Sequence, residues 1–226
     1  MKQRVLITGG NKGIGLELTK MFLASDHEVI VIARDFDGFV HADRVRCIVH
    51  DLTDVDAIAE KLDAIKNVDV LINNAGIMYS LPYDCYPNEK IERMLALNLK
   101  APVKLMELCA QKGVRRIVNN ASIAGQIGHP DVWYGIAKAG LINATRSFAK
   151  IFVGKIVVNA VAPSPVETDM LETIPVERRE AFLKSVITGR FATAEEVAKT
   201  IFWLATESPE YINGTTVDIN NGSFPR

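Results

Sequence analysis

A tyrosine and a lysine, Tyr134 and Lys138, stand four residues apart in a segment with helical periodicity. This spacing places both side chains on one face of a helix, where they are neighbours. A phenol has a pKa of about 10 and is a poor base at neutral pH, but a nearby ammonium group favours the phenolate and lowers that pKa. Such a tyrosine can give a proton to a carbonyl oxygen or take one from an alcohol. Because the spacing also arises by chance, the pair needs support from its surroundings.

A serine upstream of this pair, Ser122, follows the apolar segment 116–121, which predicts a strand. Open α/β sheets bind their ligands at the carboxyl ends of their strands. The hydroxyl of Ser122 can therefore hold a substrate oxygen beside Tyr134. Alternatively, Ser122 only begins the turn that follows the strand. Because Tyr134 and Lys138 follow in the sequence, the catalytic role of Ser122 is favoured.

A glycine-rich turn lies near the start of the chain, where residues 8–15 read Thr-Gly-Gly-Asn-Lys-Gly-Ile-Gly. Glycines permit a tight turn and a close approach of the backbone to a pyrophosphate, and the helix that follows offers free N–H groups and the positive end of its dipole. An ordinary glycine-rich turn between a strand and a helix is the alternative. The position after the first strand and before the first helix favours dinucleotide binding.

Apolar, β-branched segments alternate with helical ones along the chain. The strand segments are apolar throughout, as expected when both faces of a sheet are covered. This order predicts a single α/β domain over residues 1–226, with a doubly wound, mostly parallel, seven-stranded sheet and helices on both faces. Strands are predicted over residues 5–8, 28–33, 46–50, 68–73, 116–121, 155–160 and 216–219, and helices over residues 13–24, 55–66, 88–112, 132–152 and 194–205.

Further motifs follow the glycine turn in a fixed order: Asn-Asn-Ala-Gly at residues 73–76, Asn98 in a long helical segment, Ser122, and Tyr-Gly-Ile-Ala-Lys at residues 134–138. Together with the Thr-Gly-x-x-x-Gly-Ile-Gly spacing, they make the chain resemble the short-chain dehydrogenase/reductase family over nearly its whole length. The resemblance implies a Rossmann fold and an oxidoreductase that transfers a hydride between a nicotinamide cofactor and a carbonyl or secondary alcohol.

The resemblance also implies the catalytic roles. Tyr134 is the general acid or base, Ser122 holds the substrate oxygen, and Lys138 both activates Tyr134 and hydrogen-bonds the nicotinamide ribose. Asn98 is implied to hold a water that relays protons from Lys138. Alternatively, Asn98 only satisfies backbone groups inside its helix.

The end of the second predicted strand bears on the choice between NAD and NADP. An NAD-specific site places a carboxylate there, and an NADP site replaces it by a cation for the 2′-phosphate. In this chain Ala33 stands in the place of the carboxylate, Arg34 follows it, and Lys12 adds a second cation. These residues favour NADP(H), whereas Asp35, one position further on, leaves NAD(H) open.

A larger set of cofactor contacts is implied by the same resemblance. Asp51 matches the family's adenine-contacting position, although it could equally form a helix N-cap cluster with Thr53 and Asp54. Asn74 and Gly76 are expected to shape the floor of the cleft. The full expected set is Gly9, Asn11, Lys12, Gly13, Ile14, Gly15, Arg34, Asp51, Leu52, Asn74, Ala75, Gly76, Tyr134, Lys138, Pro163, Val166 and Thr168.

The composition limits the kinds of molecule that the protein is expected to bind. A formal net charge of −1 argues against a nucleic-acid footprint, and no apolar run approaches the roughly 18 residues of a membrane span. Three cysteines and four histidines are scattered, so neither a disulfide framework nor a metal site is expected. These features are typical of a cytoplasmic enzyme. We expect its partner to be a small carbonyl or alcohol substrate.

Two segments bear on substrate and assembly. Residues 169–191 are expected to form an apolar, helical lid over the substrate, whose identity stays open. The segments 88–112 and 132–152 resemble the helices that pair into four-helix interfaces in this family, which implies a homodimer or homotetramer.

Two other functions fit parts of the sequence. A non-catalytic NADP-binding sensor or scaffold on the same fold is expected to lose the tyrosine or the lysine, and here both are present. A nucleotide-sugar epimerase or dehydratase shares that pair but normally has a different glycine spacing. The sequence therefore favours an active NADP(H)-dependent oxidoreductase.

Overall fold

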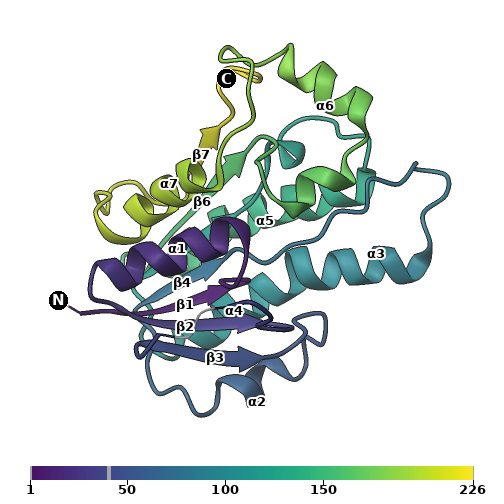
Figure 1. Cartoon of the computed structure of the whole chain (residues 1–226). Coiled ribbons are helices and arrows are strands. Elements are labelled where there is room, and N and C mark those ends of the chain that lie inside the picture. Colours follow the sequence, from purple (N-terminus) through teal and green to yellow (C-terminus); the bar gives the residue numbers. More distant parts are fainter. Residues whose placement is uncertain (1, 40–41, 226) are drawn as a thin grey trace.

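A seven-stranded sheet forms the centre of the protein in the computed structural model, which describes residues 2–39 and 42–225 (Figure 1). Every pair of neighbouring strands is parallel, and their order is β3-β2-β1-β4-β5-β6-β7. The strands are β1 (Arg4–Thr8), β2 (Glu28–Ala33), β3 (Val45–Val49), β4 (Val70–Asn73), β5 (Arg116–Asn120), β6 (Val157–Pro163) and β7 (Thr216–Ile219).

Helices cover both faces of this sheet (Figure 1). A π-helical stretch, Ala96–Lys100, joins α3 to α4, and short 3-10 turns occupy Ile123–Gly125 and Asp169–Thr173. The α-helices are α1 (Gly13–Ala24), α2 (Ile58–Leu62), α3 (Asn88–Leu95), α4 (Ala101–Ala110), α5 (Val132–Ile151), α6 (Val176–Leu183) and α7 (Ala194–Thr206).

Successive residues of a strand point into two different cores. Val5 and Ile7 of β1 pack in one core with α1 and α7, whereas Leu6 packs in the other with α2 and α4. Both cores are buried, so the residues of the central strands lose their contact with water whichever way they point, whereas the edge strands β3 and β7 stay partly exposed. Full burial of one such side chain stabilises the fold by about 1.5–3 kcal/mol. This two-sided burial explains why the strands are apolar throughout.

The order of the strands reverses between β1 and β4. The chain moves from β1 outward through β2 to β3, then crosses to β4 on the other side of β1 and continues to β7. Ligands of such sheets bind outside the carboxyl ends of the strands at this reversal. β1 ends at Thr8 and β4 ends at Asn73, so the glycine turn and the Asn-Asn-Ala-Gly motif meet there.

The predicted fold class is confirmed, and the sheet is wholly rather than mostly parallel. The predicted helix over residues 55–66 is shorter, because the N–H groups of Asp63 and Ile65 bond to carbonyls only three residues back and wind the chain out of the helix. The described residues between 34 and 44 form no helix, as the shortness of this connection predicts. Val40 and His41 lie outside the described residues.

Two further boundaries differ from the prediction. The long helix over residues 88–112 is interrupted by the π-helical stretch, which apolar periodicity does not reveal. The sixth strand continues to Pro163 rather than ending at residue 160, because it pairs with β7 as far as Pro163 opposite Ile219.

Candidate active site

The turn after β1 has the geometry of a phosphate cradle. Gly9 adopts a φ of 64°, in the left-handed region that favours glycine. A β-carbon on Gly15 would lie 2.0 Å from the carbonyl oxygen of Gly9, so no larger residue fits there. α1 begins at Gly13, and its N-cap residue, Lys12, makes no side-chain hydrogen bond to the first turn. The free N–H groups of this turn can therefore receive an anion.

Asn74 fastens this turn to the neighbouring strands. Its side-chain amide donates to the carbonyl oxygens of Thr8 at 3.1 Å and of Gly9 at 3.3 Å. The hydroxyl of Thr8 accepts the N–H groups of Asn74 and Ala75, and the side chain of Asn120 donates to the amide oxygen of Asn74 at 3.0 Å. The carboxyl ends of β1, β4 and β5 are thereby held together.

The end of β2 presents one unpaired cation. Arg34 is exposed and forms no ion pair with the described residues, and it lines the cleft with Lys12 and Asp35. The ammonium of Lys12 lies 3.7 Å from the carboxylate of Asp35, and Asn11 donates to the carbonyl oxygen of Asp35 at 2.9 Å. Asp35 therefore lies in the same part of the cleft as Lys12 and Arg34. Its carboxylate partly neutralises the charge of Lys12, and Arg34 has no ion-pair partner among the described residues.

Asp51 bonds to Thr53 in a turn and does not cap a helix, because α2 begins only at Ile58 with Ala57 as its N-cap residue. It lines the cleft, and its carboxylate accepts the N–H of Thr53 at 3.0 Å and the hydroxyl of Thr53 at 2.8 Å, as in a capped turn. The guanidinium of Arg93 also contacts it at 3.1 Å. Burial raises the pKa of the Asp51 carboxyl, but the donors from Thr53 and Arg93 outweigh this effect and hold the pKa below its usual range.

Ser122 follows β5 and faces the same cleft. Its hydroxyl oxygen accepts the N–H of Ala124 at 3.1 Å and caps the 3-10 turn that begins there. The turn-forming role of Ser122 is therefore present in the structure. It leaves the hydroxyl hydrogen available to a substrate oxygen.

Tyr134 and Lys138 project from α5 into the cleft. The buried carboxylate of Asp131 caps this helix and accepts the N–H of Tyr134 at 3.2 Å. The ammonium of Lys138 lies 5.8 Å from the centroid of the Tyr134 ring and donates to the carbonyl oxygen of Asn120 at 2.7 Å. Tyr134 and Lys138 are therefore neighbours in the structure, as their spacing predicts.

Burial shifts the two pKa values in opposite directions, because a dry environment penalises whichever form is charged. Burial raises the pKa of Tyr134 to about 12, although the hydroxyl of Ser122 acts in the other direction. Burial lowers the pKa of Lys138 to about 8. We had expected the ammonium to lower the phenol pKa, but in the protein alone burial dominates. At neutral pH Tyr134 therefore keeps its proton and Lys138 is mostly charged.

Asn98 lies beside Lys138 but outside the lining of the cleft. Its amide donates to the carbonyl oxygen of Ile77 at 2.8 Å and accepts the N–H of Ile77 at 2.9 Å. The position of a β-carbon on Gly76 would be 3.1 Å from the amide oxygen of Asn98 and 3.6 Å from the ammonium nitrogen of Lys138. The side chain of Asn98 therefore satisfies the backbone groups of Ile77 at a place that adjoins Lys138.

All of these elements open into one cleft of about 880 Å³. The segment after β6 closes one side, where the side chain of Thr168 approaches the glycine turn at Gly13. Gly15 and Asn98 lie just behind the surface. The other predicted residues all line the cleft: Gly9, Asn11, Lys12, Gly13, Ile14, Arg34, Asp51, Leu52, Asn74, Ala75, Gly76, Ser122, Tyr134, Lys138, Pro163, Val166 and Thr168.

Sequence reasoning missed several residues of this cleft. Met78 and Tyr79 follow the Asn-Asn-Ala-Gly motif, and Arg93 reaches in from α3. His129 and Arg178 contact each other, and the ring of His129 lies beside Tyr134. Only the position of His129, just before the helix that carries Tyr134, could have drawn attention to it. The others belong to no motif that the sequence displays.

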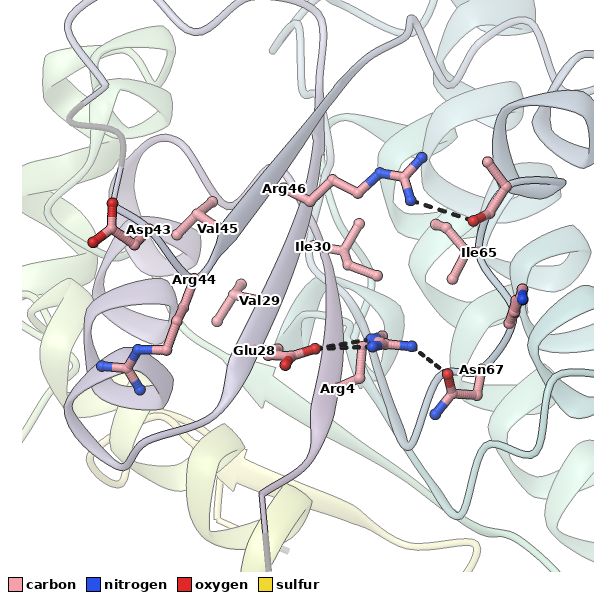
Figure 2. A pocket seen from close by; sticks show the side chains of 12 residues that line it. Arg4, Glu28, Val29, Ile30, Asp43, Arg44, Val45, Arg46, Ile65 and Asn67 are labelled. Atoms are coloured by element: carbon pink, nitrogen blue, oxygen red, sulfur yellow. Dashed lines mark hydrogen bonds and ion pairs between the residues drawn. The ribbon is translucent and has the colours of Figure 1, made fainter.

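A second hollow, of about 600 Å³, lies at the amino ends of β1 and β2, opposite the carboxyl ends that form the cleft (Figure 2). Its arginines are bonded to the protein itself: Arg4 contacts Glu28 and Asn67, and Arg46 donates to the carbonyl oxygen of Ala64 (Figure 2). Arg44 pairs with Asp26. The arginines of this hollow therefore already have partners within the protein.

Comparisons with known proteins agree with this site. The model of a family described as enoyl-(acyl carrier protein) reductase matches residues 9–223. A 3-oxoacyl-[acyl-carrier-protein] reductase of Thermotoga maritima is 33% identical over 96% of both chains. A galactitol 2-dehydrogenase of Agrobacterium fabrum is also 33% identical, over 97% of this chain and 96% of its own. This chain belongs to the short-chain dehydrogenase/reductase family.

The solved structures give the same assignment. A short chain dehydrogenase from Burkholderia cenocepacia, solved in complex with NADP, matches with a TM-score of 0.88 and 25% identity, over 98% of this chain and 97% of that one. The predicted family and Rossmann fold are therefore confirmed, and the chain is an oxidoreductase. Among the described residues, no helix is long and apolar enough to span a membrane, and no three His, Cys, Asp or Glu side chains gather as metal ligands.

The close approach at Gly15 yields a prediction about stability. Gly15→Ala places a methyl group against the Gly9 carbonyl and should lower the free energy of unfolding by about 1–3 kcal/mol, as overpacking does. Gly128→Ala is the control, because no atom lies within 4 Å of its β-carbon position. Urea unfolding measures both variants. Equal stabilities for the two would contradict the assigned role of Gly15.

Proposed function

We propose that this chain uses NADP(H) to reduce a carbonyl compound, or to oxidise the corresponding secondary alcohol, with Tyr134 as the acid or base. The observation that carries the proposal is the convergence of Ser122, Tyr134 and Lys138 in the cleft that also contains the glycine turn. A phenol, a hydroxyl and an ammonium around one cavity suit proton transfer at a single oxygen atom. Family membership supplies the reaction class within which these groups act.

Three observations support the fit of a dinucleotide. The turn at Gly15 is a cradle that a β-carbon would fill, α1 starts without a side-chain cap, and Arg34 is a free cation at the end of β2. The bound cofactor supplies the hydride in reduction and accepts it in oxidation. The Burkholderia cenocepacia relative was solved with NADP. The proposed contacts are Gly9, Asn11, Lys12, Gly13, Ile14, Gly15, Arg34, Asp51, Leu52, Asn74, Ala75, Gly76, Tyr134, Lys138, Pro163, Val166 and Thr168.

In the reductive direction Ser122 and Tyr134 both act on the carbonyl oxygen of the substrate. The hydroxyl of Ser122 donates a hydrogen bond that positions the carbonyl. Tyr134, whose pKa of about 12 keeps it protonated, transfers its proton to that oxygen as negative charge develops on it. The ammonium of Lys138, 5.8 Å from the phenol ring, stabilises the phenolate that remains.

Lys138 and Asn98 complete the arrangement. The carbonyl oxygen of Asn120 fixes the ammonium of Lys138, which faces the cleft and can also reach a ribose hydroxyl. Asn98 adjoins Lys138 and, by the family resemblance, holds a water that returns a proton to the tyrosine. In the oxidative direction every proton moves the opposite way.

A non-catalytic NADP-binding sensor would use the same fold but would not need these groups. Ser122, Tyr134 and Lys138 are all retained and all reach the cleft, which favours the enzyme. We propose further that residues 169–191 act as the substrate lid. This segment contains the 3-10 turn Asp169–Thr173 and α6, and Met170, Ile174 and Phe182 line the cleft.

We also propose a cytoplasmic location and a homodimer or homotetramer. The three cysteines are free thiols, as in proteins of reducing compartments. Within the two segments expected to pair, Met106 of α4 and Ile142 of α5 are buried inside the chain and cannot form an interface. Val132 and Ile136 of α5 are large apolar side chains that remain exposed, and they support an interface along this helix.

Replacement of the proton donor is the main test of the proposal. Tyr134→Phe removes only a hydroxyl, so turnover of a ketone that the parent reduces should fall by about 10² to 10⁴ while NADPH binding persists. Tyr211→Phe is the matched control, because Tyr211 is fully exposed. Steady-state rates and NADPH fluorescence titration check both variants. Parental turnover in Tyr134→Phe, with cofactor binding intact, would refute the mechanism.

The cofactor preference depends on Arg34. Arg34→Ala should weaken NADPH binding by about 1.5–3 kcal/mol and leave NADH binding nearly unchanged, because only the 2′-phosphate loses its charged donor. Arg44→Ala, which removes an arginine bonded to Asp26, is the control. Fluorescence titration with both cofactors gives the affinities. Equal affinities of the parent for NADPH and NADH would exclude the assignment.

Light scattering tests the assembly. We expect a mass of two or four times the 24.9 kDa of one chain at micromolar concentration. Ile136→Asp should shift the mass towards that of one chain, because it places a charge in the proposed apolar interface. A parent protein that scatters as a monomer would rule out the proposed assembly.

A further inference from the structure

The end of the cleft beyond Tyr134 contains an arginine without a carboxylate partner. Arg178 is half-buried on α6, where it lines the cleft together with Ala181 and Phe182. Its neighbour Arg179 points elsewhere and pairs with Glu172 at 3.3 Å. Among the described residues, no carboxylate lies within ion-pair distance of Arg178. The two adjacent arginines thus have different surroundings.

His129 holds Arg178 in place. The guanidinium nitrogen Nη2 of Arg178 lies 3.3 Å from Nε2 of His129. A guanidinium can only donate, so Nε2 must accept, and the imidazole proton must be on Nδ1. Nδ1 lies 3.2 Å from both the carbonyl oxygen and the backbone nitrogen of Asp131. The contact with Arg178 selects the tautomer in which the carbonyl accepts the Nδ1 proton, because a ring that accepts the N–H of Asp131 at Nδ1 has no acceptor left at Nε2. Burial, followed by the charge of Arg178, lowers the pKa of His129 and keeps the ring neutral at pH 7.

This arrangement places the cation one imidazole away from the proposed proton donor. The ring centroids of His129 and Tyr134 are 5.7 Å apart, and Arg178 contacts the His129 ring at Nε2. The carboxylate of Asp131, beside His129, is directed to other donors. Its oxygens accept the N–H of Ser80, the N–H of Tyr134 and the hydroxyl of Tyr86. It forms no ion pair with Arg178.

The position of Arg178 is also unfavourable for the fold by itself. It stands in the first turn of α6, where the helix dipole disfavours a cation. A guanidinium has five N–H donors, and only one contact to His129 is made here. The remaining donors are available inside a cleft where an anion would be bound more strongly than in water.

We propose that Arg178, positioned by His129, binds an anionic group of the substrate. The inference rests on the proposed function and narrows it: the substrate is a ketone or secondary alcohol with a carboxylate or phosphate several bonds from the reacting carbon. The oxygen at the reacting carbon contacts Ser122 and Tyr134, and the anionic end contacts the arginine. Met170 and Ile174, which line the cleft and pack in the same apolar cluster as Tyr134, accommodate the carbon chain between the two ends.

Matched substrates test the proposal. With NADPH as cofactor, 3-oxobutanoate and 4-oxopentanoate are compared with their methyl esters, and hydroxyacetone phosphate is compared with hydroxyacetone. The parent should prefer at least one anion over its neutral counterpart by about tenfold or more in kcat/KM. Arg178→Gln should reduce that preference by about tenfold to hundredfold, mainly through KM, because a charged donor is lost. Whichever anionic series responds identifies carboxylate or phosphate.

Arg179→Gln is the control, since it removes a neighbouring arginine that does not line the cleft. This variant should keep the parental preference. Circular dichroism of all three proteins checks that the fold is intact. A parent that prefers the neutral member of every pair, or an Arg178→Gln variant with the parental preference, would overturn the proposal.

A binding measurement separates this proposal from the proposed reaction. Pentanoate, which has no carbonyl to reduce, is titrated by ligand-observed NMR with and without NADP⁺. Binding to the parent and to Arg179→Gln but not to Arg178→Gln supports the anion site even if no ketone is reduced. If neutral ketones are reduced but Arg178→Gln changes neither pentanoate binding nor the substrate preference, the anion site is wrong and the reaction stands.

Discussion

A continuous path of hydrogen bonds connects the proposed catalytic lysine to the glycine turn. The ammonium of Lys138 donates to the carbonyl oxygen of Asn120, the side chain of Asn120 donates to Asn74, and the amide of Asn74 donates to the carbonyl oxygens of Thr8 and Gly9. Each member is a short polar side chain or a backbone group at the carboxyl end of a strand. The distance between the two halves of the cleft is therefore fixed by the sheet itself and not by flexible loops.

The burial of the site also shifts the pKa values of Tyr134 and Lys138. The same burial that raises the pKa of Tyr134 to about 12 lowers that of Lys138 to about 8, so two values that are close in the free side chains move apart. A phenol that retains its proton at neutral pH is a donor, which suits the reduction of a carbonyl. A lysine with a pKa near 8 is still mostly charged at pH 7, and it can stabilise the phenolate only while it is charged. One physical cause therefore acts on both groups.

The sequence predicted those parts of the structure that depend on residues close together in the chain. Four-residue spacing on one helix places Tyr134 beside Lys138, and the order strand, glycine turn, helix determines the geometry around Gly15. The apolar strands follow from burial on both faces. The bonds of Asn98, which lies in the interruption of the helix, could not be predicted, because their partner Ile77 is 21 residues distant.

The end of the cleft that we propose for the substrate is built differently from the end that binds the cofactor. The cofactor half is built from backbone atoms and glycines, and their spacing has to be constant for any dinucleotide to fit. The substrate half is built from side chains such as His129 and Arg178, which come from segments 49 residues apart and meet only in the folded chain. No spacing rule connects them, so they leave no motif. The class of reaction can be read from the sequence for this reason, whereas the anion site that we propose at Arg178 is formed only when α6 is placed against the loop that precedes α5.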